Sequence, residues 1–209
     1  MKSETEYIVP TYIYVLLSTL VVAVGIGIFR AEWSTVFISL LTLGVSLYAI
    51  RLRARLDVHI PSAFLTAAIL FVYATLFLGE VGDFYERFWW WDVVLHTGSA
   101  IGFGLIGAII LITLFWSGRV ASSPILTAVF VFAFAVAIGA VWEIFEFTMD
   151  QLFGLSMQKS GLVDTMTDLI VDCIGALVAA GATYVYLTKG KQSALTGVLE
   201  EAVEKNKST

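Results

Sequence analysis

Six long runs of apolar residues, each close to the length that crosses a bilayer, restrict the fold of this chain more than any other feature. A helix needs about 20 predominantly apolar residues to span the hydrocarbon core. Inside the bilayer every backbone polar group must be satisfied within the span, and for runs of this length the α-helix does so. We therefore predict an all-α fold, a polytopic transmembrane helical bundle of about six spans.

The predicted spans lie near residues 11–29, 34–50, 62–79, 93–116, 124–148 and 166–187. The three prolines of the chain, Pro10, Pro61 and Pro124, each fall just before or at a predicted helix start. Proline is well tolerated there because its missing N–H would be unpaired in any residue. The proline positions therefore support the span boundaries independently of hydrophobicity.

The composition leaves no room for a soluble domain. Of the 209 residues 59% are hydrophobic and 14% charged, whereas soluble domains average about 45–50% and about 25%. We predict one transmembrane domain over residues 1–191, followed by a cytoplasmic amphipathic helix and disordered tail over 192–209. The net charge of −5 and the lack of a long basic run argue against a nucleic-acid partner.

The distribution of Lys and Arg predicts the orientation in the membrane. If the loop after the second span is cytoplasmic, nine of these residues lie on the cytoplasmic side and three on the other, as the positive-inside rule favours. The nine are Lys2, Arg51, Arg53, Arg55, Arg119, Lys189, Lys191, Lys205 and Lys207, and the three are Arg30, Arg87 and Lys159. We therefore predict a multi-pass protein of the cell (inner or plasma) membrane with both termini cytoplasmic.

Ionisable residues gather in the last three spans and at their ends. They are Asp92, His96, Glu143, Glu146, Asp150, Asp164, Asp168 and Asp172. Such a group at mid-bilayer costs roughly 3 kcal/mol, so it normally faces the bundle interior and serves a function. Their spacings of three, four, seven and eight residues place each set on one helix face. With six spans, all eight residues fall in the outer half of the membrane.

A carboxylate-rich set with one histidine predicts a divalent cation. The proposed ligands are Asp92, His96, Glu143, Glu146, Asp168 and Asp172. Oxygen ligands favour Mg²⁺, Mn²⁺ or Ca²⁺, while His96 leaves Zn²⁺ or Fe as weaker candidates. A proton relay or cation pathway and a hydrogen-bonded structural network remain open as alternatives. Asp150 and Asp164 lie near helix ends, where Asp164 could instead cap the sixth span.

Small residues and a terminal amphipathic segment complete the pattern. Gly98 and Gly102, together with Ala100, Gly104 and Ala108, predict a surface for close helix packing. Near the C-terminus, apolar residues recur with helical spacing behind Ser193, and this predicts a short helix on the inner membrane surface. These apolar residues are Leu195, Val198, Leu199, Ala202 and Val203.

Three motifs carry a family resemblance. They are Trp91-Asp92-x-x-Leu95-His96, then Trp142-Glu143-x-x-Glu146, then Asp164-x-Met166-x-Asp168-Leu169-x-x-Asp172-x-x-Gly175-Ala176. Together they resemble the inner-membrane family typified by bacterial YjdF, and more distantly the VanZ-like membrane proteins. The resemblance covers roughly residues 60–187. It implies a multi-span membrane protein in which the motif residues act as a unit.

Three classes of function fit this cluster. The first is a metal-dependent enzyme acting on a lipid or lipid-linked substrate at the outer leaflet, with His96, Glu143 and Asp168 as catalytic candidates. The second is a proton- or cation-coupled transporter, in which a homodimer would supply the symmetry that six spans lack. The third is a non-catalytic membrane scaffold. All three place the protein in contact with the lipid bilayer, and we rank them in this order.

Overall fold

The computed structural model is built from helices throughout the residues that it describes, which are 9–55, 60–116, 118, 120–190 and 193–207. The elements are α1 (Thr11–Arg30), α2 (Trp33–Arg55), α3 (Ser62–Val72), the π-helix η2 (Tyr73–Val81), α4 (Phe84–Arg87), α5 (Trp91–Trp116), α6 (Pro124–Phe153), α7 (Leu162–Lys189) and α8 (Ala194–Lys207). Six helical segments are long and apolar enough to cross a membrane, with α3 and η2 forming one of them. The predicted all-α, six-span fold is therefore confirmed.

The helix boundaries follow local rules at their starts. Pro10 and Pro61 are the N-cap residues of α1 and α3, and Pro124 is at the first turn of α6, as predicted. Ser123 caps α6, because its hydroxyl accepts the Leu126 N–H at 3.3 Å. The predictions that concern Lys2, Arg119, Lys191 and residues 208–209 lie outside the described residues.

The last two membrane helices are longer than predicted at the end that carries the carboxylates. Helix α6 continues to Phe153 rather than 148, and α7 starts at Leu162 rather than 166. A count of apolar residues stops where Asp150 and Asp164 appear, although the helical backbone hydrogen bonds continue past both. These two acidic residues therefore lie in the last and first turns of helices and not in a loop.

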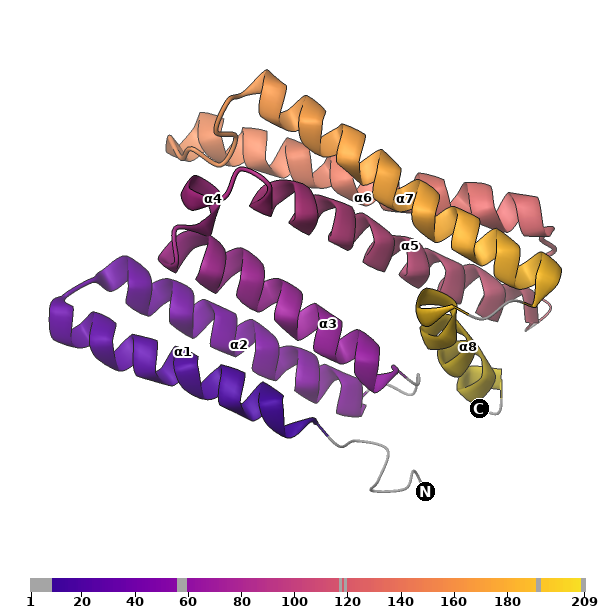
Figure 1. Cartoon of the computed structure of the whole chain (residues 1–209), viewed down its shortest axis with the longest axis horizontal. Helices are drawn as coiled ribbons and strands as arrows, with labels where there is room; N and C mark the ends of the chain where they lie inside the picture. Colours follow the sequence, from indigo (N-terminus) through magenta and orange to yellow (C-terminus); the bar gives the residue numbers. More distant parts are fainter. Residues whose placement is uncertain (1–8, 56–59, 117, 119, 191–192, 208–209) are drawn as a thin grey trace. The chain divides into compact units, whose positions relative to one another are not determined.

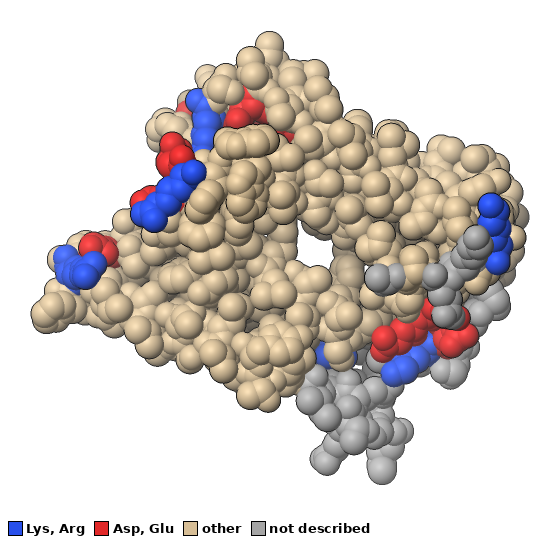
Figure 2. All heavy atoms as spheres, in the orientation of Figure 1, with Lys and Arg blue, Asp and Glu red and all other residues tan. Residues whose placement is uncertain are grey.

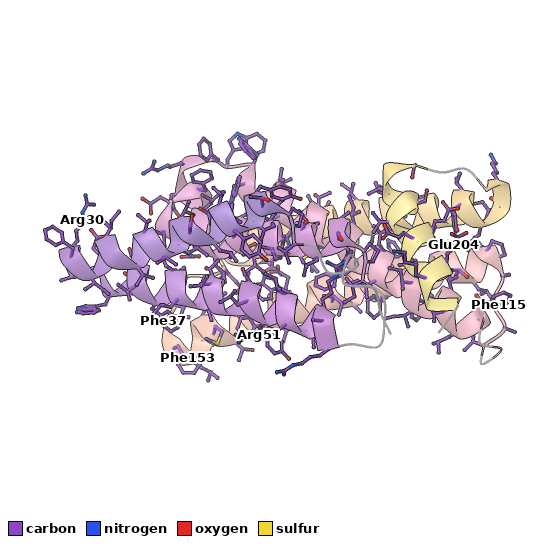
Figure 3. All side chains as sticks on the ribbon, turned by 90° about the horizontal axis from the view of Figure 1, so that it is seen from below. Arg30, Phe37, Arg51, Phe115, Phe153 and Glu204 are labelled. Atoms are coloured by element: carbon purple, nitrogen blue, oxygen red, sulfur yellow. The ribbon has the colours of Figure 1, made fainter. Side chains whose placement is uncertain are left out.

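The chain divides into two compact units, residues Met1–Trp91 and Asp92–Thr209. The N-terminal unit packs α1 and α2 with α3 and η2 around a core that includes Ile13, Leu20 and Ile69. In Figure 3, the labelled Arg30 and Arg51 lie at opposite ends of the hairpin formed by α1 and α2. The apolar middle of the two helices therefore lies between Arg30 at one end of the hairpin and Arg51 at the other.

Hydroxyl groups supply the polar contacts inside the N-terminal unit. The Thr19 and Tyr73 hydroxyls are 2.9 Å apart, and Tyr12 donates to Thr66 at 3.3 Å. Helix α2 also buries one stripe of small polar side chains, Ser39, Thr42 and Ser46. Small residues of this kind let membrane helices approach closely without burying a charge.

The π-helix η2 is the feature of this unit that the sequence pattern does not predict. Its nine residues continue α3 directly, with hydrogen bonds one residue wider than in an α-helix. At its end, Gly79 lies against the ring of Tyr85 from the α4 region, and a side chain at Gly79 would collide with that ring. Hydrophobic periodicity does not distinguish the two helix types over such a short segment.

The C-terminal unit is a bundle of α5, α6 and α7, with α8 packed against one end. Helices α6 and α7 run alongside each other over most of their length (Figure 1). The core brings together Ala108 of α5, Val131 of α6 and Ala179 of α7. Figure 3 labels Phe115 and Glu204 at one end of this unit and Phe153 at the other, so α5 ends where α6 begins.

Helix α8 occupies the segment in which the amphipathic helix was predicted. Ser193 and Thr196 cap it reciprocally, because each residue's hydroxyl accepts the other's backbone N–H, at 3.2 and 2.7 Å. Leu199 and Val203 join the core of the bundle. The cytoplasmic location of this helix and the single-domain assignment of residues 1–191 stay predictions.

The predicted packing surface on α5 is half wrong. Gly104 packs so closely that an added Cβ would lie 2.5 Å from the Cβ of Ala179, and Ala100 and Ala108 are buried as well. A Cβ added at Gly98 or Gly102 would meet nothing within 4 Å. The reason is helical phase, since Gly102 is rotated by about 200° from Ala100 and so lies near the opposite side of the helix.

The outer surfaces of the helices are apolar. On the face shown in Figure 2, uncharged atoms cover the sides of the helices and the charged atoms gather near helix ends. Large side chains such as Val15, Ile144 and Leu177 are each more than half exposed. Such surfaces are satisfied by lipid chains rather than by water, as expected of spans in a bilayer.

Candidate metal centre

His96 lies at the centre of a group of carboxylates in the C-terminal unit. Its Nε2 atom is 3.8 Å from Asp92 Oδ1 and 3.9 Å from Glu143 Oε1. Its other ring nitrogen, Nδ1, is 3.4 Å from Asp172 Oδ1. The three helices α5, α6 and α7 therefore each contribute a carboxylate to one imidazole.

Asp168 completes the cluster from α7. One ligand atom from each of Asp92, His96 and Asp168 lies within 4.8 Å of the other two. Asp92 and His96 are one turn apart on α5, and Asp168 and Asp172 are one turn apart on α7. These spacings place each pair on one helix face, and the packing of α5 against α7 turns the two faces toward each other.

The cluster becomes more buried from Asp92 inward. The exposed fraction of the side chain falls from 29% at Asp92 to 10% at His96, 4% at Glu143 and 1% at Asp172. Asp92 therefore lies nearest the surface of the unit, and Asp172 lies deepest. Asp168 is also buried.

Two of these carboxylates lack hydrogen-bond donors. Within the described part of the chain, neither oxygen of Glu143 and neither oxygen of Asp172 has a hydrogen-bond partner. Buried polar atoms in native proteins are almost always paired, because an unpaired one costs free energy. A cation, a bound proton, water or, for Asp172 Oδ1, the imidazole nitrogen 3.4 Å away would satisfy these atoms.

Two glycines make room for the cluster, and sequence reasoning missed the role of both. A Cβ added at Gly139 of α6 would overlap the Asp172 carboxylate, and one at Gly175 of α7 would lie 2.5 Å from the Thr97 carbonyl oxygen of α5. Gly139 lies four residues before Glu143, on the same face of α6. This four-residue spacing is the sequence feature that could have linked Gly139 to the carboxylate cluster.

The remaining acidic residues make other contacts. Glu146 Oε1 accepts the indole N–H of Trp142 at 2.9 Å, one turn back on α6. Asp150 accepts the backbone N–H groups of Met157 and Gln158, at 2.8 and 2.9 Å. The last two bonds fix the connection between α6 and α7 from within the last turn of α6.

Asp164 holds the other side of the same connection. It accepts the Lys159 backbone N–H at 3.0 Å. Gly161 is the N-cap residue of α7 and makes no side-chain cap, so the predicted capping role of Asp164 is replaced by a bond into the preceding loop. Asp150 and Asp164 therefore have a structural use that does not involve His96.

The chemistry that this arrangement permits is cation binding. A set of carboxylates with one imidazole matches the ligands of hard divalent cations and also accommodates Mn²⁺. The half-buried Asp92 and the buried His96 and Asp168 could hold such an ion.

Beyond Asp172 the three helices of the bundle carry no charged residue and no histidine until their far ends. Segments 97–116, 124–142 and 173–188 contain no Asp, Glu, His, Lys or Arg. Their buried side chains include Leu105, Val131 and Ala179, which form one hydrophobic core. The ionisable cluster is therefore confined to one end of the C-terminal unit.

Comparison with known proteins identifies the family. A family model described as "Predicted membrane protein (DUF2238)" matches residues 11–189, from the first residue of α1 to the last of α7. A Thermotoga maritima protein described as "Uncharacterized protein" is 34% identical over 109 residues. This match covers 51% of this chain and 54% of the relative, so it spans about half the length of each. No solved structure matches the chain. Because the family model extends through all six membrane helices, the chain belongs to the DUF2238 family of predicted membrane proteins.

Proposed function

We propose that this protein binds a divalent cation inside the membrane, through Asp92, His96, Glu143 and Asp168. The observation that carries the proposal is that the Glu143 carboxylate points toward His96 Nε2. Its Oε1 approaches the same imidazole nitrogen as Asp92, yet both of its oxygens are buried and, apart from the nearby Thr165 hydroxyl, no described side chain offers them a hydrogen-bond donor. A cation near His96 Nε2 would satisfy these oxygens and offset the repulsion among the carboxylates.

The ligand set favours Mg²⁺, Mn²⁺ or Ca²⁺ over Zn²⁺ or Fe. Three carboxylates and one imidazole are mainly oxygen ligands, which hard cations prefer. Among the hard cations, Mn²⁺ accepts an imidazole most readily. We therefore use Mn²⁺ as the first probe and Mg²⁺ as the second.

We further propose that the cation serves an enzyme acting on a lipid or lipid-linked substrate at the outer leaflet. Asp92 is the most exposed ligand, so a headgroup would approach from its side. A bound divalent cation would polarise a phosphoryl or carbonyl oxygen of that headgroup. His96 would hold the site together, and Glu143 and Asp168 would accept a proton from water or a substrate hydroxyl at a carboxylate oxygen.

A proton- or cation-coupled transporter is the second candidate. Asp164, Asp168 and Asp172 form a ladder that extends about 12 Å along α7, which favours a path for ions. The ladder ends at Asp172, since no Asp, Glu, His, Lys or Arg follows it in 173–188. A binding site closed at its inner end therefore fits the C-terminal unit better than a continuous pathway does. A homodimer remains a separate prediction.

The proposal is tested by calorimetry of Mn²⁺ and Mg²⁺ binding to the purified protein in mild detergent. We expect wild type to bind and Asp168→Asn to lose more than 100-fold in affinity. Asp150→Asn is the matched control, because it makes the same chemical change at the same end of the bundle, away from His96, and keeps one of the two oxygens that accept from the loop. Its affinity should equal that of wild type.

The pH dependence gives a second readout. Carboxylates and imidazole bind a cation only when deprotonated, so affinity should fall as the pH is lowered. A wild-type protein that takes up neither ion at neutral pH would refute the proposal. If that protein instead released protons on a pH jump in a manner that Asp168→Asn abolishes, the transporter would become the leading candidate.

A further inference from the structure

We infer that Asp172 is a positioning residue that orients His96, whereas Asp92, Glu143 and Asp168 bind the cation. The inference deepens the proposed function and rests on it. It follows from a division of the carboxylates between the two nitrogens of one imidazole ring. Asp92 and Glu143 approach Nε2, and Asp172 approaches Nδ1.

The two nitrogens of an imidazole cannot serve the same cation. When one of them is the ligand, the other carries a proton and donates it to a nearby acceptor. Asp172 Oδ1, 3.4 Å from Nδ1, is the acceptor on that side of the ring. This bond would hold the neutral imidazole in the tautomer that leaves the Nε2 lone pair directed at Asp92 and Glu143.

The surroundings of Asp172 leave little space for an ion. Its Oδ1 is directed at His96, and its Oδ2 lies against Gly139, where even one added carbon would overlap it. Asp172 is also the deepest member of the cluster, with 1% of its side chain exposed. A cation and its water ligands therefore fit on the Asp92 side of the ring and not between Asp172 and α6.

Gly139 sets the position of Asp172 by having no side chain. Any larger residue there would displace the carboxylate from its place beside the imidazole. Gly139→Ala would thus disturb the orientation of His96 while leaving every proposed cation ligand in the sequence. Gly102 is the matched control, since it is also a helical glycine but an added Cβ meets nothing within 4 Å.

The expected affinities separate the two roles. Loss of a residue that orients a metal-bound histidine typically weakens binding 10–100-fold, whereas loss of a ligand should weaken it further. We expect Asp172→Asn and Gly139→Ala to retain one bound Mn²⁺ per chain with about 10–100-fold lower affinity. Asp168→Asn should lose more than 100-fold in affinity, and Gly102→Ala should match wild type.

A spectroscopic readout shows which nitrogen binds. The chain has two histidines, so a His59→Gln background leaves His96 as the single ¹⁵N-histidine signal. With ¹¹³Cd²⁺ as the probe, the wild-type spectrum should show coupling at Nε2 and a protonated Nδ1. In Asp172→Ala and Gly139→Ala, coupling at Nδ1 should appear, a change that simple destabilisation of the fold would not produce.

Each outcome decides between the roles. If Asp172→Asn weakens binding as much as Asp168→Asn, Asp172 is a ligand, and the cation site survives without this inference. If Asp172→Asn and Gly139→Ala bind as wild type does, with coupling still confined to Nε2, the positioning role is refuted. If Asp172→Asn does not fold, Gly139→Ala decides alone. If wild type binds no cation, the proposed function and this inference fail together.

Discussion

The two units of this protein bury polar groups in opposite ways. In the described part of the N-terminal unit, the buried polar side chains are the hydroxyls of Ser39, Thr42 and Ser46 and, near the end of α2, the guanidinium of Arg53. In the C-terminal unit the buried polar groups include three carboxylates, those of Glu143, Asp168 and Asp172, and the imidazole of His96. Hydroxyls stabilise helix contacts at little cost, whereas carboxylates need a counter-ion or a proton.

This difference distinguishes polar groups that serve helix packing from polar groups that serve the proposed function. The N-terminal spans can be explained by helix association alone, because apart from Arg53, whose guanidinium donates to the Ile60 carbonyl and the Ser62 hydroxyl, their buried polar side chains are small and uncharged. The carboxylates of the C-terminal unit cannot, since Glu143, Asp168 and Asp172 are buried close together around one imidazole. We therefore assign the function to the C-terminal unit and a packing role to the buried hydroxyls of the other.

The largest expected effect concerns orientation, which is all or none. Reporter fusions after residues 56 and 190 should both be cytoplasmic, because the positive-inside rule assigns nine basic residues to that side. A fusion in the connection between α6 and α7 should read as external. External signals at residues 56 and 190 would instead place the carboxylates of the C-terminal unit in the inner leaflet.

The next largest effect is expected when a carboxylate is added to the interior of the N-terminal unit or removed from that of the C-terminal unit. Thr42→Asp inserts a carboxylate at a fully buried position of α2 and should cost roughly 3 kcal/mol. Asp168→Asn removes one from the C-terminal cluster, so without added cation it should leave stability unchanged or raise it by relieving repulsion. Thermal unfolding in detergent measures both. Equal destabilisation by the two variants would remove the distinction between the units.

Packing within the C-terminal bundle gives a smaller effect. Gly104→Leu should destabilise by about 1–3 kcal/mol through overpacking against α6 and α7, because an added Cβ already approaches Ala179 at 2.5 Å. Gly102→Leu should be silent, since nothing lies within 4 Å of a Cβ there. Unfolding temperature and detergent-solubilised size report both changes. A large loss for Gly102→Leu would reveal a partner on that face.

The smallest effect concerns the hydroxyl pair of the N-terminal unit. Thr19→Val or Tyr73→Phe breaks the 2.9 Å contact and should cost about 0.6 kcal/mol, the average for such bonds between membrane helices. A double-mutant cycle isolates the coupling between the two. Neither variant should change Mn²⁺ affinity, and a change of tenfold or more would tie this unit to the cation site.

The sequence by itself determined the membrane helices and the distribution of charge along them. Runs of apolar residues near bilayer length require helices, and proline positions mark their starts, because both effects depend only on neighbouring residues. The spacing of Asp92 and His96, and of Asp168 and Asp172, likewise predicted which residues share a helix face. With six spans, it also followed that these residues meet at one end of the bundle.

Only the tertiary structure decided how each helix is rotated against its neighbours. That rotation selected Gly104 and not Gly102 for close packing, and it placed Gly139 against Asp172. It also directed Asp172 to one imidazole nitrogen and Glu143 to the other, while Glu146 lies against Trp142. A helical repeat defines the faces of a helix but not which face meets which partner, because that depends on interdigitation of side chains from segments distant in sequence.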